Sequence, residues 1–195
     1  MTKGMRWRIV TLQAILVLVL GGASLFLISE GNFVNQTIHD QLAAQQISFP
    51  PASAITAGGA LDPAKFSPEI RAQAGNEVLT GDQARIYAND FIAVHLKNVA
   101  GGKTYSQIDT SSGTAAQIAT AQAQKSSLFQ GETLRNMLLN AWGWSMLATY
   151  TIWGGFGLML AALVALGALV YELFFSKQED TVTVPQAKST RVVPA

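Results

Sequence analysis

The chain has 195 residues, of which 49% are hydrophobic and 13% charged, and its formal net charge is +1. This charged share is about half that of an ordinary soluble domain, and a nearly neutral chain offers nucleic acid no electrostatic footprint. The absence of cysteine excludes disulfides, thiolate metal sites and cysteine nucleophiles. Any domain outside a membrane must therefore be held together by packing alone.

Residues 9–28 form the first of two long apolar segments. They include thirteen Leu, Ile, Val or Phe residues and no charge, which favours membrane insertion by about 4–8 kcal/mol. The basic residues of segment 1–8 predict that this segment is cytoplasmic. A cleaved signal peptide is the alternative, because Gly21-Gly22-Ala23 resembles a cleavage site. The apolar run continues to Ile28, and we therefore favour an uncleaved transmembrane helix.

Residues 29–141 are predicted to form a small helical extracytoplasmic domain. The domain begins with a stalk helix over 29–47, in which apolar residues recur at steps of four (Val34, Ile38, Leu42). Pro50-Pro51 must end this helix, because proline lacks the backbone donor. A linker over 50–79, rich in Ala, Gly, Ser and Pro, is expected to be irregular, whether it is draped over the domain or mobile.

The clearest helix of this domain is predicted over 82–98. Thr80 and Gln83 have the spacing of a capping box at its start, and Gly101-Gly102 is a typical stop signal at its end. The apolar spacing places Tyr87, Phe91 and Val94 in the core of the outer domain. Two further helices are expected over 112–129 and 132–141, with a joint at Gly131 between them.

The second apolar segment is longer than one crossing requires. Residues 136–171 carry no charge over 36 positions, whereas a bilayer core needs roughly 20. We therefore predict a helix at the outer interface over 142–150 and a transmembrane helix over 151–171. The residues that follow, 172–195, are expected to be a disordered cytoplasmic tail.

Small residues in the second crossing suggest close helix packing. Gly157, Ala161 and Ala165 are spaced four apart and would allow another helix to approach closely. Gly21 and Gly22 of the first crossing are candidates for the opposite surface. Chance occurrence of such residues carries equal weight, since many membrane helices contain them.

Residues that could carry chemistry are few. The two histidines, His39 and His95, are weak candidates for metal ligands, because a non-haem iron site needs two histidines and a carboxylate at suitable spacing. The chain has no Gly-x-Ser-x-Gly nucleophile elbow and no complete phosphate-binding loop. The sequence predicts no catalytic residues, no cofactor and no metal.

Three stretches resemble a known family: IHDQLAAQQISFPP, TGDQARIYANDFIAVHL with GGKTYSQ, and LFQGETLRNMLLNAWGW. They are similar to a family of small two-span membrane proteins found mainly in actinobacteria. Its members often carry the name aromatic ring-opening dioxygenase, small subunit. The resemblance covers roughly residues 5–175 and implies no residue roles.

The fold expected from the sequence is an all-α membrane protein with two transmembrane helices flanking a small helical domain. We expect a multi-pass plasma-membrane protein with both termini cytoplasmic. Its partners would be membrane lipid and either a membrane protein or a second copy, with no nucleic acid. The leading hypothesis is protein–protein contact within a membrane complex or a homo-oligomer. The alternatives are a metal-dependent oxygenase, as the family name implies, and an extracytoplasmic ligand-binding sensor.

Overall fold

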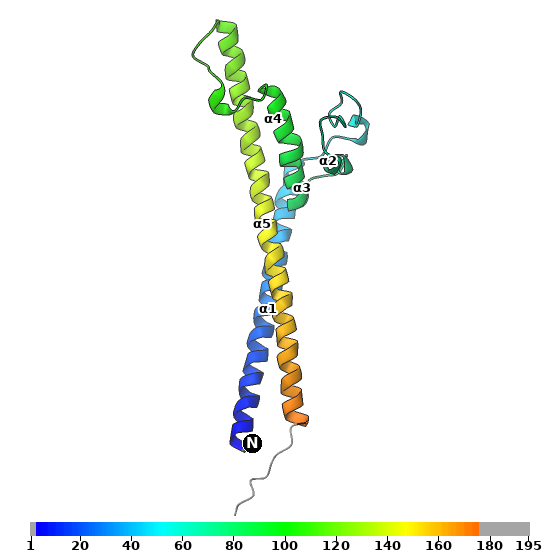
Figure 1. Cartoon of the computed structure of the whole chain (residues 1–195), viewed down its shortest axis with the longest axis vertical. Coiled ribbons are helices and arrows are strands. Elements are labelled where there is room, and N and C mark those ends of the chain that lie inside the picture. Colours follow the sequence, from blue (N-terminus) through cyan, green and yellow to red (C-terminus); the bar gives the residue numbers. More distant parts are fainter. Residues whose placement is uncertain (1–2, 176–195) are drawn as a thin grey trace, which may run out of the picture. The chain divides into compact units, whose positions relative to one another are not determined.

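Two long helices dominate the computed structural model, which describes residues 3–175 (Figure 1). Helix α1 spans Lys3–Gln45 and helix α5 spans Ala115–Phe174. Short helices lie between them: η1 (Ala52–Ala54), α2 (Pro68–Ala72), α3 (Gly81–Ile86), the π-helix η2 (Tyr87–Ile92), α4 (Ala93–Val99) and η3 (Tyr105–Gln107). Within 3–175 the fold is therefore helical, apart from one isolated antiparallel bridge between Ser48 and Glu77.

Both α1 and α5 are long and apolar enough to cross a membrane. Only 11% of the most apolar window of α1 and 6% of that of α5 is buried in the chain. Large apolar side chains such as Leu18 and Val164 are 75% and 68% exposed. The core helix of a soluble protein would instead bury such residues.

The chain divides into two compact units. The first unit combines residues 1–25 with 156–195, and is described for 3–25 and 156–175; the second unit is 26–155. Most of the predicted tail, residues 176–195, lies outside the described residues.

Helix α1 is continuous through the predicted boundary between crossing and stalk. It ends at Gln45, and Gln46 adopts the left-handed conformation with φ of 52°, a frequent way for a helix to stop. The helix thus ends five residues before Pro50, so proline is not what terminates it.

Helix α5 is also continuous, so the helices predicted over 112–129 and 132–141 form one helix that begins at Ala115 and runs on through 142–150 and 151–171. The expected joint at Gly131 is wrong. A Cβ atom at Gly131 would lie 2.4 Å from Leu96 Cδ2, so this glycine lets α4 pack closely against α5. Glycine in a helix interior is unfavourable by about 1 kcal/mol relative to alanine, and here it gives room to a neighbouring side chain.

The core of the second unit lies where α1, the short helices and α5 meet. Its largest buried side chains come from every part of the unit: Ile38, Leu42, Phe49, Leu61, Ile70, Val78, Ile86, Ile92, Leu96, Leu128 and Leu138. Burial of this kind stabilises a domain by about 25 cal/mol per Å² of apolar surface. The unit therefore holds together by packing, as a chain without cysteine must.

The segment between α1 and α3 is more ordered than the predicted irregular linker. Its Leu61 and Ile70 are fully buried, and Ser67 caps α2 by accepting a hydrogen bond from the Ile70 backbone N–H. Asp62 accepts hydrogen bonds from the backbone N–H groups of Gly58 (2.8 Å) and Ala64 (2.9 Å). These bonds lower the pKa of the Asp62 carboxyl, the Ala64 bond contributing most.

Candidate contact surfaces

The predicted helix-packing residues of the first unit differ in their exposure. Gly157 and Ala161 are exposed, and Ala165 is half-buried. A Cβ atom added at Gly157, Gly21 or Gly22 would meet nothing within 4 Å, so the suggested pairing of these glycines is not formed within the chain. The residue that packs is Ala162, which is 5% exposed. An outward role for the Gly157 and Ala161 face stays a prediction.

Arg6 joins the two helices of the first unit. Its guanidinium donates hydrogen bonds to the carbonyl oxygens of Glu172 (2.7 Å) and Leu173 (2.9 Å), and its Nε lies 3.7 Å from the Glu172 carboxylate. A cation at the end of a helix satisfies carbonyls that have no partner in the helix and suits the helix dipole. Arg6 therefore caps α5 and fixes its end beside α1.

The predicted core residues of the second unit occupy the margin of the core. Tyr87 and Phe91 are half-buried and pack against the buried cluster, with Tyr87 also stacking edge-on against Phe49. Burial raises the pKa of the Tyr87 hydroxyl. Val94 is half-buried but does not belong to this cluster. The fully buried positions are Ala88 and Ile92 instead.

The π-helix explains this shift of the buried face. An i→i+5 helix adds a residue to the turn, so the spacing of 3.6 residues that links Tyr87, Phe91 and Val94 does not hold between Tyr87 and Ile92. Such π-turns are rare and often occur at functional sites. Here the turn directs Asn89 and Asp90 to different neighbours.

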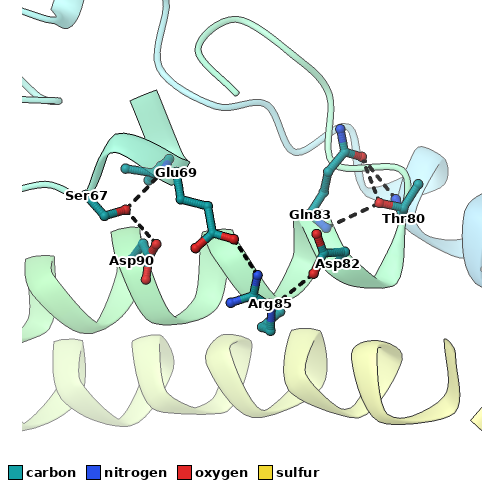
Figure 2. Close-up of polar contacts among 8 residues, drawn as sticks. Ser67, Glu69, Thr80, Asp82, Gln83, Arg85 and Asp90 are labelled. Atoms are coloured by element: carbon teal, nitrogen blue, oxygen red, sulfur yellow. Dashed lines mark hydrogen bonds and ion pairs between the residues drawn. The ribbon is translucent and has the colours of Figure 1, made fainter. Parts of the chain in front are cut away.

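Polar contacts hold the π-helix between its neighbours. Arg135 of α5 donates to Asn89 Oδ1 (3.0 Å) and pairs with Glu132 (3.1 Å). On the other side, the Ser67 hydroxyl donates to Asp90 Oδ2 (2.7 Å; Figure 2). The π-helix is thereby linked to α5 through one residue and to the start of α2 through the next.

The start of α3 carries the predicted capping box, which is confirmed (Figure 2). The Gln83 backbone N–H donates to Thr80 Oγ1 (3.2 Å), and the Thr80 backbone N–H donates to Gln83 Oε1 (3.1 Å). Beside it, Arg85 bridges Glu69 (2.6 Å) and Asp82 (3.0 Å). These two carboxylates raise the pKa of the Arg85 guanidinium, and Glu69 contributes most.

Helix α3 approaches α5 closely at Gly81. A Cβ atom at this position would lie 2.3 Å from Ser145 Cβ and 3.3 Å from Trp142 Cα. Gly81 itself is buried. No side chain larger than hydrogen fits here without displacing one of the helices.

An open groove runs between α1 and α5 within the second unit. One end has a volume of about 350 Å³ and is lined by Phe33, Val34, Met137 and Trp144 among others. The adjoining end, about 190 Å³, is lined by Leu42, Gln45, Leu134 and Leu138 among others. Both ends share Ile38, Gln41, Met137 and Ala141. We call this continuous surface the apolar groove.

The apolar groove exposes large side chains and carries no charge. Phe33 and Met137 are each 66% exposed, and Trp144 is 56% exposed. None of the residues that line either end is charged. Its other lining residues are apolar, apart from Thr37, Gln41, Gln45 and Asn140, and exposed apolar surface is typical of a contact site.

The two walls of the groove follow a heptad spacing. On α1 four of the lining residues recur at steps of four, three and four, two of them apolar (Val34, Ile38) and two polar (Gln41, Gln45). On α5 they recur at steps of three, four and three (Leu134, Met137, Ala141, Trp144). This is the spacing at which side chains interlock with those of an adjacent helix.

Neither histidine belongs to a cluster of ligand residues within 3–175. His39 is exposed, lies 3.3 Å from Asp40 and lines a hollow of about 430 Å³ with Asn35, Thr80 and Ser145. His95 is exposed and stacks on the Phe91 ring. Among residues 3–175 no group of three or more His, Cys, Asp or Glu side chains could hold a metal ion.

Comparison of the chain with protein-family models, curated proteins and solved structures finds no match. The resemblance to the two-span membrane family therefore stays a prediction, as does the oxygenase activity that its name implies.

Sequence reasoning missed both the Arg6 contact and the apolar groove. Arg6 and Glu172 are 166 positions apart in the chain, and no local pattern links them. The heptad spacing of the groove walls is visible in the sequence. If the pairing of α1 with α5 had been known, this spacing could have indicated that the two helices together bind a third helix.

Proposed function

We propose that this protein is a multi-pass plasma-membrane protein that acts by protein–protein contact. Residues 9–28 and 151–171 would cross the lipid, with segments 1–8 and 172–195 on the cytoplasmic side. The small helical region between the crossings would be extracytoplasmic. The observation that carries the proposal is the exposure of apolar side chains along both long helices. Contact of this surface with water would be unfavourable, whereas lipid would cover it.

The Arg6 contact supports this topology. It holds the start of α1 beside the end of α5, so the charged residues that flank the two apolar segments would meet at one membrane surface. A helical hairpin of this kind needs both of its ends on the same side. The positive charge of segment 1–8 makes that side the cytoplasm.

The apolar groove is the contact site in this proposal, and its occupant is a helix of another membrane protein. An uncharged groove complements an uncharged helix face, because a charged side chain would lose its hydration there without gaining a partner. The heptad spacing of both walls fits a third helix. Pairing of two copies through the same groove would place hollow on hollow, since a two-fold interface uses one surface twice.

Photocrosslinking in intact cells tests the proposed contact. A photoreactive amino acid at Met137 should capture a single membrane protein, at a peptide that mass spectrometry places in an uncharged helical segment. The same amino acid at exposed Lys65 is the control and should capture much less. Capture of a second copy, or equal capture from both positions, would contradict the proposed occupant. Reporter fusions that place either terminus outside the cell would contradict the topology.

A further inference from the structure

A second hollow of the second unit lies where α4 ends, beside the early turns of α5. It has a volume of about 350 Å³. Six of its lining residues carry the argument below, and we call them the lysine pocket: Leu96, Lys97, Lys103, Tyr105, Leu128 and Glu132.

The backbone fixes the two lysines at the rim of this pocket. Gly101 and Gly102 adopt positive φ values of 60° and 82°, which turn the chain sharply after α4. The Gly102 N–H donates to the Lys97 carbonyl oxygen (2.8 Å), and the Lys103 N–H donates to that of Ala100 (3.1 Å). Lys103 is thereby returned toward Lys97, although six positions separate them in the chain.

Two of the residues that line the pocket, Lys97 and Lys103, are basic, and one, Glu132, is acidic. Lys97 and Lys103 are exposed and make no ion pair with any residue in the described range 3–175. A third lysine, Lys125, lies 4.8 Å above the Tyr105 ring in a cation–π contact, and its charge also helps to lower the pKa of Asp109.

The nearby carboxylates, Glu132 and Asp109, form no ion pair with Lys97 or Lys103. Glu132 pairs with Arg135 at 3.1 Å. Asp109 accepts hydrogen bonds from the Ser111 backbone N–H and hydroxyl and from the Ser112 hydroxyl. Residues 97–125 contain three lysines and one acid, whereas residues 30–90 contain seven acids and three bases. The second unit as a whole has nine acidic and seven basic residues, and its segment 97–125, around the lysine pocket, is locally positive.

The floor of the pocket is apolar. Leu96 and Leu128 are only 5% and 4% exposed and form its base, while Tyr105 is 49% exposed at its edge. Tyr105 also packs against Phe129, with ring centroids 6.4 Å apart. A ligand that fits both features must combine negative charge with an apolar group.

We infer that the lysine pocket binds an acidic polypeptide segment that carries an apolar side chain. The carboxylates pair with Lys97 and Lys103, and the apolar side chain enters between Leu96, Leu128 and Tyr105. A polyphosphate chain would satisfy the lysines but has no group for the apolar floor. The inference rests on the proposed contact function and gives the partner a second, acidic site of attachment.

Peptide binding to the purified full-length protein tests this inference. The protein is held in nanodiscs of phosphatidylcholine, with empty nanodiscs as the blank, and binding is followed by fluorescence anisotropy. The probe is a labelled peptide of alternating glutamate and leucine. It should bind, and the binding should weaken as salt screens the charges. A peptide of alternating glutamate and serine should bind less tightly, because it lacks the apolar group.

Substitutions locate the binding. K97Q/K103Q removes both charges and keeps polar side chains that are one atom shorter, and it should weaken binding of the glutamate–leucine peptide about tenfold. K65Q is the matched control on an exposed lysine outside the pocket and should leave affinity unchanged. Circular dichroism should show that both variants fold like the wild type.

Three results would overturn the inference. They are equal affinity of K97Q/K103Q and the wild type, equal binding of the serine and leucine peptides, and tighter binding of inorganic polyphosphate than of either peptide. If the peptide binds but the photoreactive amino acid at Met137 captures no membrane protein, only the apolar-groove proposal would be overturned.

Discussion

The Arg6 guanidinium donates hydrogen bonds to two backbone carbonyls of α5, those of Glu172 and Leu173, while its distance to the Glu172 carboxylate is 3.7 Å. The backbone contacts are thus shorter than the ion pair. Arg6 serves chiefly as a helix cap supplied by a residue from the opposite end of the chain.

We therefore expect R6Q to destabilise the first unit more than E172Q. R6Q loses the charge-assisted hydrogen bonds to the carbonyls, an effect of about 1–3 kcal/mol, whereas E172Q keeps them. Thermal unfolding of the full-length protein in nanodiscs, followed by circular dichroism, measures both variants. An E172Q variant that is equally or more destabilised would show that the ion pair dominates.

Substitution of Gly81 should loosen the contact between α3 and α5. G81A places a Cβ atom 2.3 Å from Ser145 Cβ, and overpacking of this kind typically costs about 1–3 kcal/mol. Thermal unfolding should show the loss, and the added S145G substitution should recover part of it. The matched control is G143A, whose Cβ atom would meet nothing within 4 Å and should not destabilise. Equal behaviour of the two alanine variants would contradict the close contact.

The capping box predicts a measurable contribution from Thr80. T80A removes the oxygen that accepts the Gln83 N–H bond and should destabilise the protein by about 1 kcal/mol. T120A is the comparison, because the Thr120 hydroxyl only donates to the Ala116 carbonyl within its own exposed helix. It should change the free energy of unfolding by less than about 0.5 kcal/mol. A T80A variant as stable as T120A would show that the cap contributes nothing.

Asp109 should give stability that disappears in acid. The hydroxyl and backbone donors of Ser111 and the Ser112 hydroxyl lower the pKa of its carboxyl to about 2 from 3.8, with a smaller contribution from Lys125. Because the folded pKa is the lower one, the stabilisation is fully present above pH 3.8 and is lost as the pH falls toward 2. NMR titration of the Asp109 carboxyl carbon should give a midpoint near 2.

A matched variant separates this effect from general acid denaturation. The difference in stability between the wild type and D109N should be constant above about pH 5 and should shrink below pH 4. A difference that does not depend on pH would show that the serine hydrogen bonds do not favour the charged form.

Local signals in the sequence predicted the elements that depend on local physics. The Thr80–Gln83 capping box and the Gly101-Gly102 stop are confirmed, because each depends on residues within one turn of the helix end. The two long apolar helices were equally visible, since composition alone decides them.

Contacts between distant residues decided the rest. Gly131 resembles a joint in the sequence, but its role depends on Leu96, which lies 35 positions earlier. The π-helix has no local signal, because its unusual turn is held by contacts of Asn89 and Asp90 with other elements. Of the expected core residues, Tyr87 and Phe91 pack against the buried cluster, whereas Val94, beyond the π-helix, does not belong to it.

The candidate surfaces show the same division. The spacing of Leu134, Met137 and Ala141 indicates an apolar helix face, but the sequence does not say whether the domain covers it. The lysine pocket depends on a glycine turn that returns Lys103 toward Lys97 and on Leu128 from another helix. Neither surface could be assembled from sequence spacing alone.

The antiparallel bridge between Ser48 and Glu77 bears on how this architecture could vary. Beside this bridge, the Phe49 backbone N–H donates a hydrogen bond to the Asn76 carbonyl oxygen (2.9 Å). The Val78 backbone N–H donates one to the Ile47 carbonyl oxygen (2.9 Å). These backbone hydrogen bonds hold the residues that follow α1 beside the residues that precede α3. They do not depend on the length of the segment between them. Insertions and deletions should concentrate between Pro50 and Gly75, where a change in length need not redirect either helix.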